Sequence, residues 1–224
     1  MSRRGWGFVV GVALALAVVS MLSNINTAAQ IAGDADGLRM TRLTASQLVN
    51  SGVAWAGLMV LAGWLVKYPR QAAAAGVAAG LFSLAAHYAM GQAAGIYTGE
   101  IWELNLNWFL MATVAGAPLG LVGAAAHRAD DVGLLARLMV PFGALAEPFV
   151  MGMFVRSEAL PWPDRFAGPV AGTLLTTAGA LALVWLVVRE RSARREAARQ
   201  LGVLVERGPL IDQPVRADER HAVG

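Results

Sequence analysis

The stretch LLARLMVPFGALAEPFVMGMFV, residues 134–155, decides how this chain folds. It is long enough to cross the ~30 Å hydrocarbon core of a bilayer, which takes about 20 residues of helix. Glu147 is its one acidic residue, and Arg137 lies near its start. An ionisable group at membrane depth is costly unless it faces the protein interior and has a partner or a task. The stretch therefore predicts a membrane-spanning helix, with Glu147 as the first candidate for a functional residue.

The composition of the whole chain is that of a membrane protein. Of its 224 residues, 57% are hydrophobic and only 15% are charged, and the mean hydropathy is +0.54. Soluble domains carry about 25% charged residues. The absence of cysteine excludes disulfides, thiolate nucleophiles and cysteine-ligated metals. The three histidines are far apart and match no metal-ligand spacing, so neither a metal nor a cofactor is expected.

Hydropathy predicts an all-α, polytopic bundle of six transmembrane helices that forms one domain over residues 1–188. The spans are expected at residues 6–23, 48–66, 71–91, 105–126, 133–155 and 167–188. The first apolar run is long for a signal peptide, so we expect it to be retained. An arginine-rich tail, residues 189–224, should begin as a helix and end without regular structure. The segment 24–47 is long for a loop and is a candidate lid.

The distribution of lysine and arginine predicts the orientation. With the N-terminus inside, 14 of the 18 basic residues fall in inner segments and 4 in outer ones. The positive-inside rule then gives a multi-pass plasma-membrane protein with both termini in the cytoplasm. Topology and contact with anionic lipids of the inner leaflet explain the basic residues, so nucleic acid is not an expected partner. Association with further copies of the chain stays open.

In this orientation the polar and aromatic side chains of the spans gather in the outer half of the membrane. Besides Glu147 they are Asn50, Trp55, His87, Tyr88, Tyr97, Glu103 and Trp108. They predict a pocket in the outer half, organised around Glu147. An apolar pocket favours a neutral carboxyl group, which can donate a proton. Structural roles stay open: interface tryptophans, hydrogen bonds between helices, and a carboxyl group that only fixes helix register.

Several short motifs resemble those of a known family. They are residues 50–55 (NSGVAW), His87-Tyr88, Trp108 with residues 116–120 (GAPLG), and Ala146-Glu147. The family consists of six-helix actinobacterial integral membrane proteins without an assigned function. The resemblance covers roughly the second to the fifth span, and glycine- and alanine-rich spans match one another easily.

In size, helix count and its acid-plus-aromatic pattern, the chain is also similar to small bacterial membrane-bound terpene cyclases of meroterpenoid biosynthesis. That resemblance implies an isomerase-type reaction, the proton-initiated cyclisation of a prenylated, lipophilic small molecule. It implies Glu147 as the acid and His87 or Glu103 as the base. The walls that stabilise the carbocation would be Trp55, Tyr88 and Trp108. The sequence has no D-D-x-x-D run, so magnesium-dependent ionisation of a diphosphate is not supported.

Two other classes of function fit the same pattern. A small permease, or the substrate-capture subunit of an importer, would also have six spans and an outward pocket. Its ligand contacts would be Asn50, His87, Tyr97, Glu103 and Glu147. A non-catalytic membrane scaffold is the third class. The sequence-based hypothesis is the cyclase, with the transport subunit as its alternative.

Overall fold

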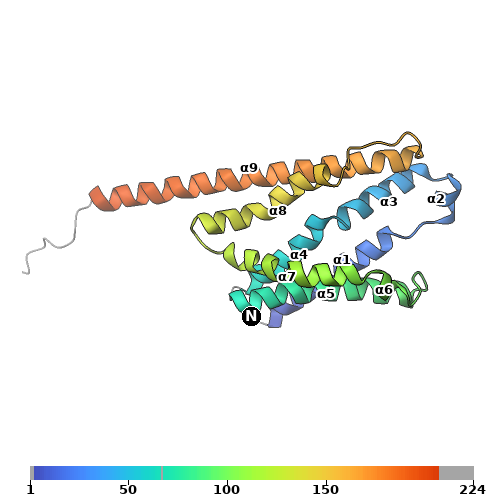
Figure 1. The fold of residues 1–224 in the computed structure, drawn as a ribbon. Coiled ribbons are helices and arrows are strands. Elements are labelled where there is room, and N and C mark those ends of the chain that lie inside the picture. Colours follow the sequence, from blue (N-terminus) through green and yellow to red (C-terminus); the bar gives the residue numbers. More distant parts are fainter. Residues whose placement is uncertain (1–2, 67, 207–224) are drawn as a thin grey trace, which may run out of the picture. The chain divides into compact units, whose positions relative to one another are not determined.

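A computed structural model of the chain describes residues 3–66 and 68–206, and this part of the chain contains helices and no strand. Figure 1 shows the helices in chain order. They are α1 (Arg3–Ser23), α2 (Ala28–Ala32), α3 (Asp36–Val49), α4 (Gly52–Val66), α5 (Pro69–Ala93), α6 (Ile101–Leu104), α7 (Leu106–Ala125), α8 (Asp131–Val150) and α9 (Trp162–Glu206). The chain divides into two compact units, Met1–Leu183 and Val184–Gly224. The arrangement described below is that of the first unit.

The described part of the chain is all-helical, as predicted, and several of its helices are long and apolar. By length and composition, α1, α5, α7, α8 and α9 can each cross a membrane, and the bent pair α3 and α4 passes the same test together. Each helix coincides with one predicted span to within a few residues, except that α8 ends early and α9 continues to Glu206. The helical start of the predicted tail therefore belongs to α9, and the predicted unstructured end lies outside the described residues.

The segment between the first two predicted spans is mostly helical. A capping box between Thr27 and Gln30 starts α2, and Gly33, with a φ of 84°, ends it in the left-handed conformation that glycine adopts without strain. From α3, Arg42 donates hydrogen bonds to the carbonyl oxygen of Ser23 (2.7 Å) and to Oδ1 of Asn26 (2.6 Å). These bonds hold α3 against the end of α1, so the candidate lid is an ordered, anchored element.

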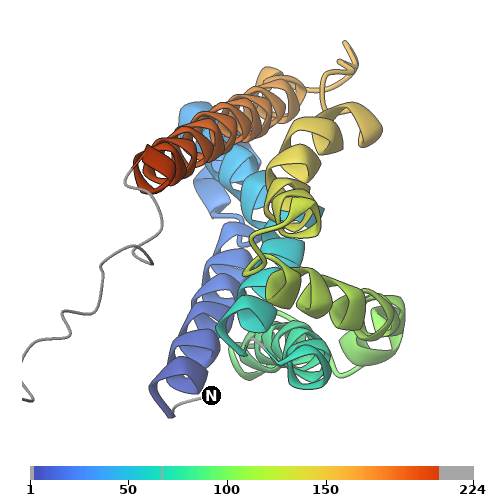
Figure 2. The ribbon, with the colours of Figure 1, turned by 90° about the vertical axis from the view of Figure 1, so that its left-hand side faces the viewer.

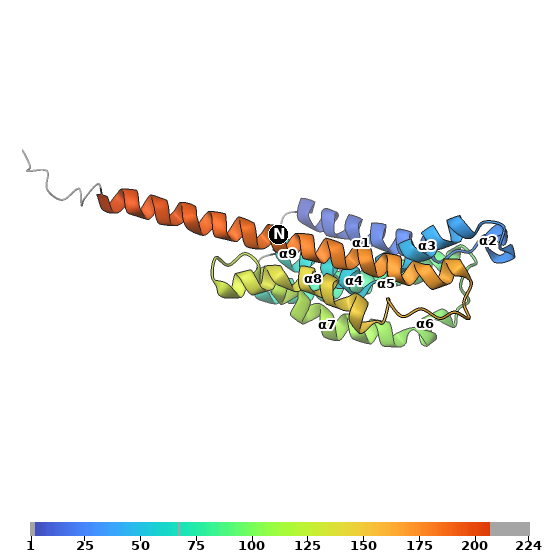
Figure 3. The same ribbon diagram turned by 90° about the horizontal axis from the view of Figure 1, so that it is seen from above.

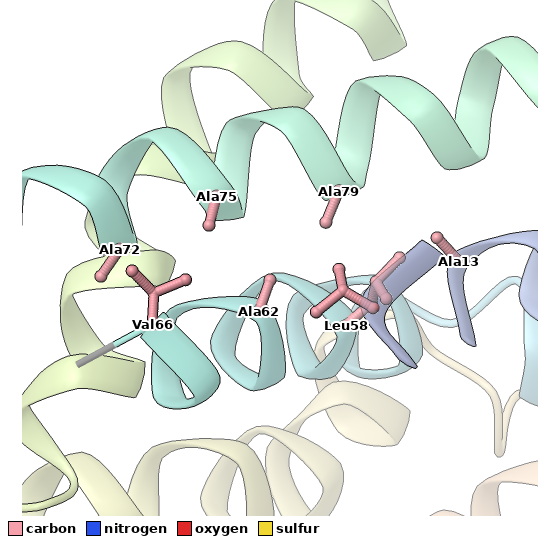
Figure 4. Close-up of a cluster of buried hydrophobic side chains, with 8 residues drawn as sticks. Ala13, Leu58, Ala62, Val66, Ala72, Ala75 and Ala79 are labelled. Carbon is pink, nitrogen blue, oxygen red and sulfur yellow. The ribbon is translucent and has the colours of Figure 1, made fainter. Parts of the chain in front are cut away.

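The helix α4 lies among α1, α5, α7 and α8, and contacts each of them (Figure 2). The core around it is built from small side chains. Figure 4 shows the buried cluster in which Leu58, Ala62 and Val66 of α4 face α5 and α1. Their partners there are Ala13, Ala72, Ala75 and Ala79, with Val9 completing the cluster. Small side chains let membrane helices approach closely, which replaces the hydrophobic driving force that lipid does not provide.

The helices of this core approach each other closely at glycine residues. A Cβ atom added to Gly63 of α4 would lie 2.0 Å from the carbonyl oxygen of Gly120 in α7. One added to Gly76 of α5 would lie 2.2 Å from the carbonyl oxygen of Gly116. These glycines therefore form the packing contacts of α7 with α4 and α5. Large apolar side chains, such as Leu110 and Val114 of α7, point outward instead and are more than half exposed.

Three of the connections lie at one end of the first unit. In Figures 1 and 3 the α1–α3 segment with α2, the α5–α7 segment with α6, and the α8–α9 connection share that end. The break between α3 and α4, where the two helices meet at 42°, precedes Gly52.

Candidate functional site

The candidate site is the start of α4, where the bent pair breaks. The first four N–H groups of any helix have no partner within the helix. Here Oγ of Ser51 accepts a hydrogen bond from the backbone N–H of Ala54 (3.1 Å). The N–H groups of Gly52 and Val53 are then left for another acceptor. Such groups are satisfied by side chains, by water or by a ligand.

The carboxylate of Glu147 is that acceptor. Its Oε1 accepts from the N–H of Gly52 at 2.7 Å, and its Oε2 accepts from the N–H of Val53 at 2.8 Å. A negative charge at this position also interacts favourably with the positive end of the helix dipole. Glu147 therefore joins α8 to the break between α3 and α4. The sequence left open a structural role for Glu147, in which its carboxyl group only fixes the helix register. The two bonds to α4 are a specific form of that role.

The helix α8 ends at Val150, although its apolar sequence continues to Val155. The backbone N–H of Met151 bonds to the carbonyl oxygen of Glu147, and that of Met153 bonds to Pro148. Gly152, with a φ of 61°, then turns the chain out of the helix. Glu147 thus lies in the last turn of α8, closer to the helix end than the apolar run alone predicts.

A cavity of about 580 Å³ opens beside this carboxylate. Its lining combines the end of α3, the start of α4, the end of α8 with the following connection, and the start of α9. The lining residues are Asn24, Ser46, Gln47, Asn50, Ser51, Glu147, Met151, Gly152, Met153, Val155, Ser157, Leu160, Asp164, Arg165, Gly168 and Pro169. Nine of the sixteen lining residues carry an amide, a hydroxyl or a charged group, and none of the sixteen is aromatic. The cavity therefore offers a solute several hydrogen-bonding and charged groups beside its apolar side chains.

Hydrogen bonds fix the wall formed by α1 and α3. Ser20 of α1, which is fully buried, donates to Oδ1 of Asn50 (2.5 Å). Nδ2 of Asn50 donates to the carbonyl oxygen of Ser46 (3.0 Å), and the hydroxyl of Ser46 donates to Oδ1 of Asn24 (2.8 Å). Asn50, predicted to contact a ligand, therefore does lie beside Glu147 at the cavity.

The other predicted site residues lie elsewhere. His87 and Tyr88 of α5 are buried against Tyr97, whose hydroxyl is 3.2 Å from Nε2 of His87. The ring of Tyr88 also packs against Trp102 and Phe109. Together with Trp55, which packs at its edge, this aromatic cluster is a core and does not line the cavity.

Two predicted residues point away from any shared site. Trp108 is 61% exposed on the outer side of α7. Glu103 is exposed in the short helix α6. The sequence alone did not show which face of the helix each of these side chains occupies.

Sequence reasoning missed two charged residues of the cavity, Asp164 and Arg165 at the start of α9. Asp164 forms an ion pair with Arg39 of α3 (2.9 Å). The signal in the sequence was weak. Four basic residues lie in the predicted outer segments, and the sequence does not show which of them forms an ion pair. Among the described residues, no group of three or more histidine, aspartate or glutamate side chains is placed to hold a metal ion.

Comparison of the chain with protein-family models, with characterised proteins and with solved structures gave no match.

Proposed function

We propose that this chain is a multi-pass membrane protein that binds a small polar solute in the cavity at the α3–α4 break. In this proposal it acts as a permease or as the substrate-capture subunit of an importer. The observation that carries the proposal is the Glu147 carboxylate, bound to two N–H groups at the start of α4 and lining the cavity. Broken membrane helices whose ends meet charged groups are a recurrent way to build solute sites in transporters.

The lining of the cavity supports a polar ligand. Asn24, Gln47 and Asn50 contribute amides, and Ser46 and Ser51 contribute hydroxyls. Its volume of about 580 Å³ falls within the range of small-molecule sites, roughly 300–1,000 Å³. In the predicted orientation, with both termini in the cytoplasm, the cavity would open toward the outside of the cell. That is where a capture subunit meets its solute.

The terpene cyclase hypothesis stays a prediction with less support. A proton-initiated cyclisation needs an acid at one end of an aromatic-lined pocket. Here both carboxylate oxygens of Glu147 accept hydrogen bonds from backbone N–H groups. The aromatic side chains of Tyr88 and Trp102 pack against each other, away from the residues that line the cavity.

The absence of cysteine makes the proposal directly testable. Gln47→Cys places a single thiol in the cavity wall, and Thr98→Cys places one in the exposed α5–α6 connection at the same end. Both variants are labelled on intact cells with a membrane-impermeant maleimide. The competitors are panels of amino acids, sugars, nucleosides and polyols, with farnesylated hydroquinone as the lipophilic one.

We expect both thiols to react from outside, and a polar solute to slow labelling of Gln47→Cys but not of Thr98→Cys. Cells that express the chain should then take up or retain that solute. Protection by farnesylated hydroquinone alone would favour the cyclase. Failure of every polar solute to protect Gln47→Cys would overturn the proposal.

A further inference from the structure

Two charged groups that line the cavity have no charged partner in the described part of the chain. The carboxylate of Glu147 accepts two backbone N–H groups and forms no ion pair there. The guanidinium of Arg165 forms neither a hydrogen bond nor an ion pair with any described residue, and its Nε is buried. Its Cζ lies 5.7 Å from the centroid of the Phe166 ring.

Among the neighbouring charges, Arg39 and Asp164 form an ion pair, although Oδ2 of Asp164 is buried and accepts no hydrogen bond in the described part of the chain. Arg39 donates to Asp164 and to the carbonyl oxygen of Gln30, which is 3.2 Å from its Nη1. Arg42 donates to oxygen atoms at the end of α1 and does not line the cavity. Apart from Asp164, which is paired with Arg39, the cavity presents one negative and one positive group on different walls, with α8 carrying Glu147 and α9 carrying Arg165. A partly buried charge without a partner is unfavourable, so both groups gain from a ligand that supplies the opposite charges.

We propose that the cavity binds a zwitterionic solute, with an ammonium group at Glu147 and a carboxylate at Arg165. This inference rests on the proposed function and names its substrate class. A carboxylate has about four lone-pair positions, so Glu147 can accept from an ammonium group while it keeps both bonds to α4. A free guanidinium binds a carboxylate through two parallel N–H···O bonds. A solute with a single charge can pair with only one of these two groups.

The fit can be tested with zwitterions of increasing charge separation. Glycine, 4-aminobutyrate and 6-aminohexanoate carry the same two groups at different spacings, and hexylamine and hexanoate each carry one of them. The readout is again protection of Gln47→Cys from the maleimide. We expect one zwitterion to protect at a concentration about tenfold or more below that of either singly charged compound, since a charged hydrogen bond contributes about 1.5–3 kcal/mol and 1.4 kcal/mol is tenfold.

Arg165→Gln has a matched control in Arg156→Gln. Both arginines contact the ring of Phe166, with Cζ of Arg156 at 4.9 Å from its centroid, but only Arg165 lines the cavity. Arg165→Gln should raise the protecting concentration of the best zwitterion about tenfold and leave that of hexylamine unchanged, because the ammonium group does not use the guanidinium. Arg156→Gln should change neither. Since Arg165 makes no bond to α4, this variant tests the site without disturbing the helix start.

The possible outcomes separate the inference from the proposed function. If singly charged compounds protect as well as every zwitterion, or if Arg165→Gln behaves like Arg156→Gln, the zwitterion inference is wrong. If a sugar or polyol then protects Gln47→Cys, the cavity is still a polar solute site and the proposed function stands. If no polar solute protects it at all, both fall together.

Discussion

Replacing Glu147 by alanine tests whether its carboxylate holds the break between α3 and α4. The change removes the acceptor of two N–H groups, those of Gly52 and Val53, at 2.7 and 2.8 Å. A hydrogen bond to a charged group contributes about 1.5–3 kcal/mol, and loss of a single capping side chain typically costs about 1 kcal/mol. Gly52 is exposed, so water can replace part of its lost bond. Val53 is half-buried, so the loss of its hydrogen bond accounts for the larger part of the free-energy cost. We expect the free energy of unfolding to fall by about 2–3 kcal/mol.

The assay is equilibrium unfolding in detergent micelles, followed by the fluorescence of the seven tryptophans and by far-UV circular dichroism. Glu103→Ala is the matched control, because Glu103 is an exposed carboxylate in α6. Its effect should stay within about 0.5 kcal/mol, as is usual for surface positions. Glu147→Gln should be intermediate, since an amide keeps one acceptor oxygen but turns an N–H donor toward the second N–H group.

A second variant checks that the effect acts through the start of α4. Ser51→Ala removes the side-chain acceptor of the N–H of Ala54 at the same helix end, while the bond of that N–H to the carbonyl oxygen of Ser51 remains. Because both side chains cap one helix, the double variant with Glu147→Ala should deviate from additivity by about 0.5 kcal/mol or more. If Glu147→Ala were as stable as Glu103→Ala, the carboxylate would not hold α4, and our account of the junction would be refuted.

Two further predictions concern other parts of the fold. Gly120→Ala should destabilise the protein by about 1–3 kcal/mol, because its Cβ atom would lie 2.1 Å from the carbonyl oxygen of Ala72; Gly11→Ala, with nothing within 4 Å, should be neutral or slightly stabilising in the same unfolding assay. Asp130 caps α8 and bonds to Arg128, whose side chain, together with the N–H of Gly133, lowers the pKa of Asp130 from 3.8 to about 2. Its contribution to stability is therefore complete above about pH 4 and is lost as the pH falls through 2, so melting temperatures of Asp130→Asn should depend less on pH between 4 and 2 than those of the unaltered chain.

Hydropathy predicted the helices well because the signal for each one is strong and local. A run of about 20 apolar residues has few alternatives to a membrane helix, and the ends of α1, α5 and α7 fall within a few residues of the predicted limits. Where the pattern stayed apolar but the backbone changed, the prediction was less accurate. The left-handed Gly152 and the Pro148 next to Glu147 end α8 early, although residues 151–155 are no more polar than those before them.

The site was predicted only in part because depth along a helix says nothing about the face of the helix. Asn50 and Glu147 lie on different helices, and both line the same cavity. Trp108 points outward from its helix, while His87 is buried and contacts Tyr97. The partner of Glu147 could not be found by looking for a basic side chain. It is a pair of backbone N–H groups almost a hundred positions away, and every residue except proline has such a group.

The structural and the proposed binding role of Glu147 reinforce each other. The carboxylate holds α8 to the start of α4, and the same oxygen atoms are in reach of the cavity. An ammonium group bound there would leave both bonds to α4 in place and add a third favourable partner to the carboxylate. Binding would therefore stabilise the junction rather than open it, by about 2.7 kcal/mol at a solute concentration one hundred times the Kd. A solute that had to displace Glu147 from α4 would instead lose the energy of two charged hydrogen bonds, which makes an anionic ligand at this position the less favourable choice.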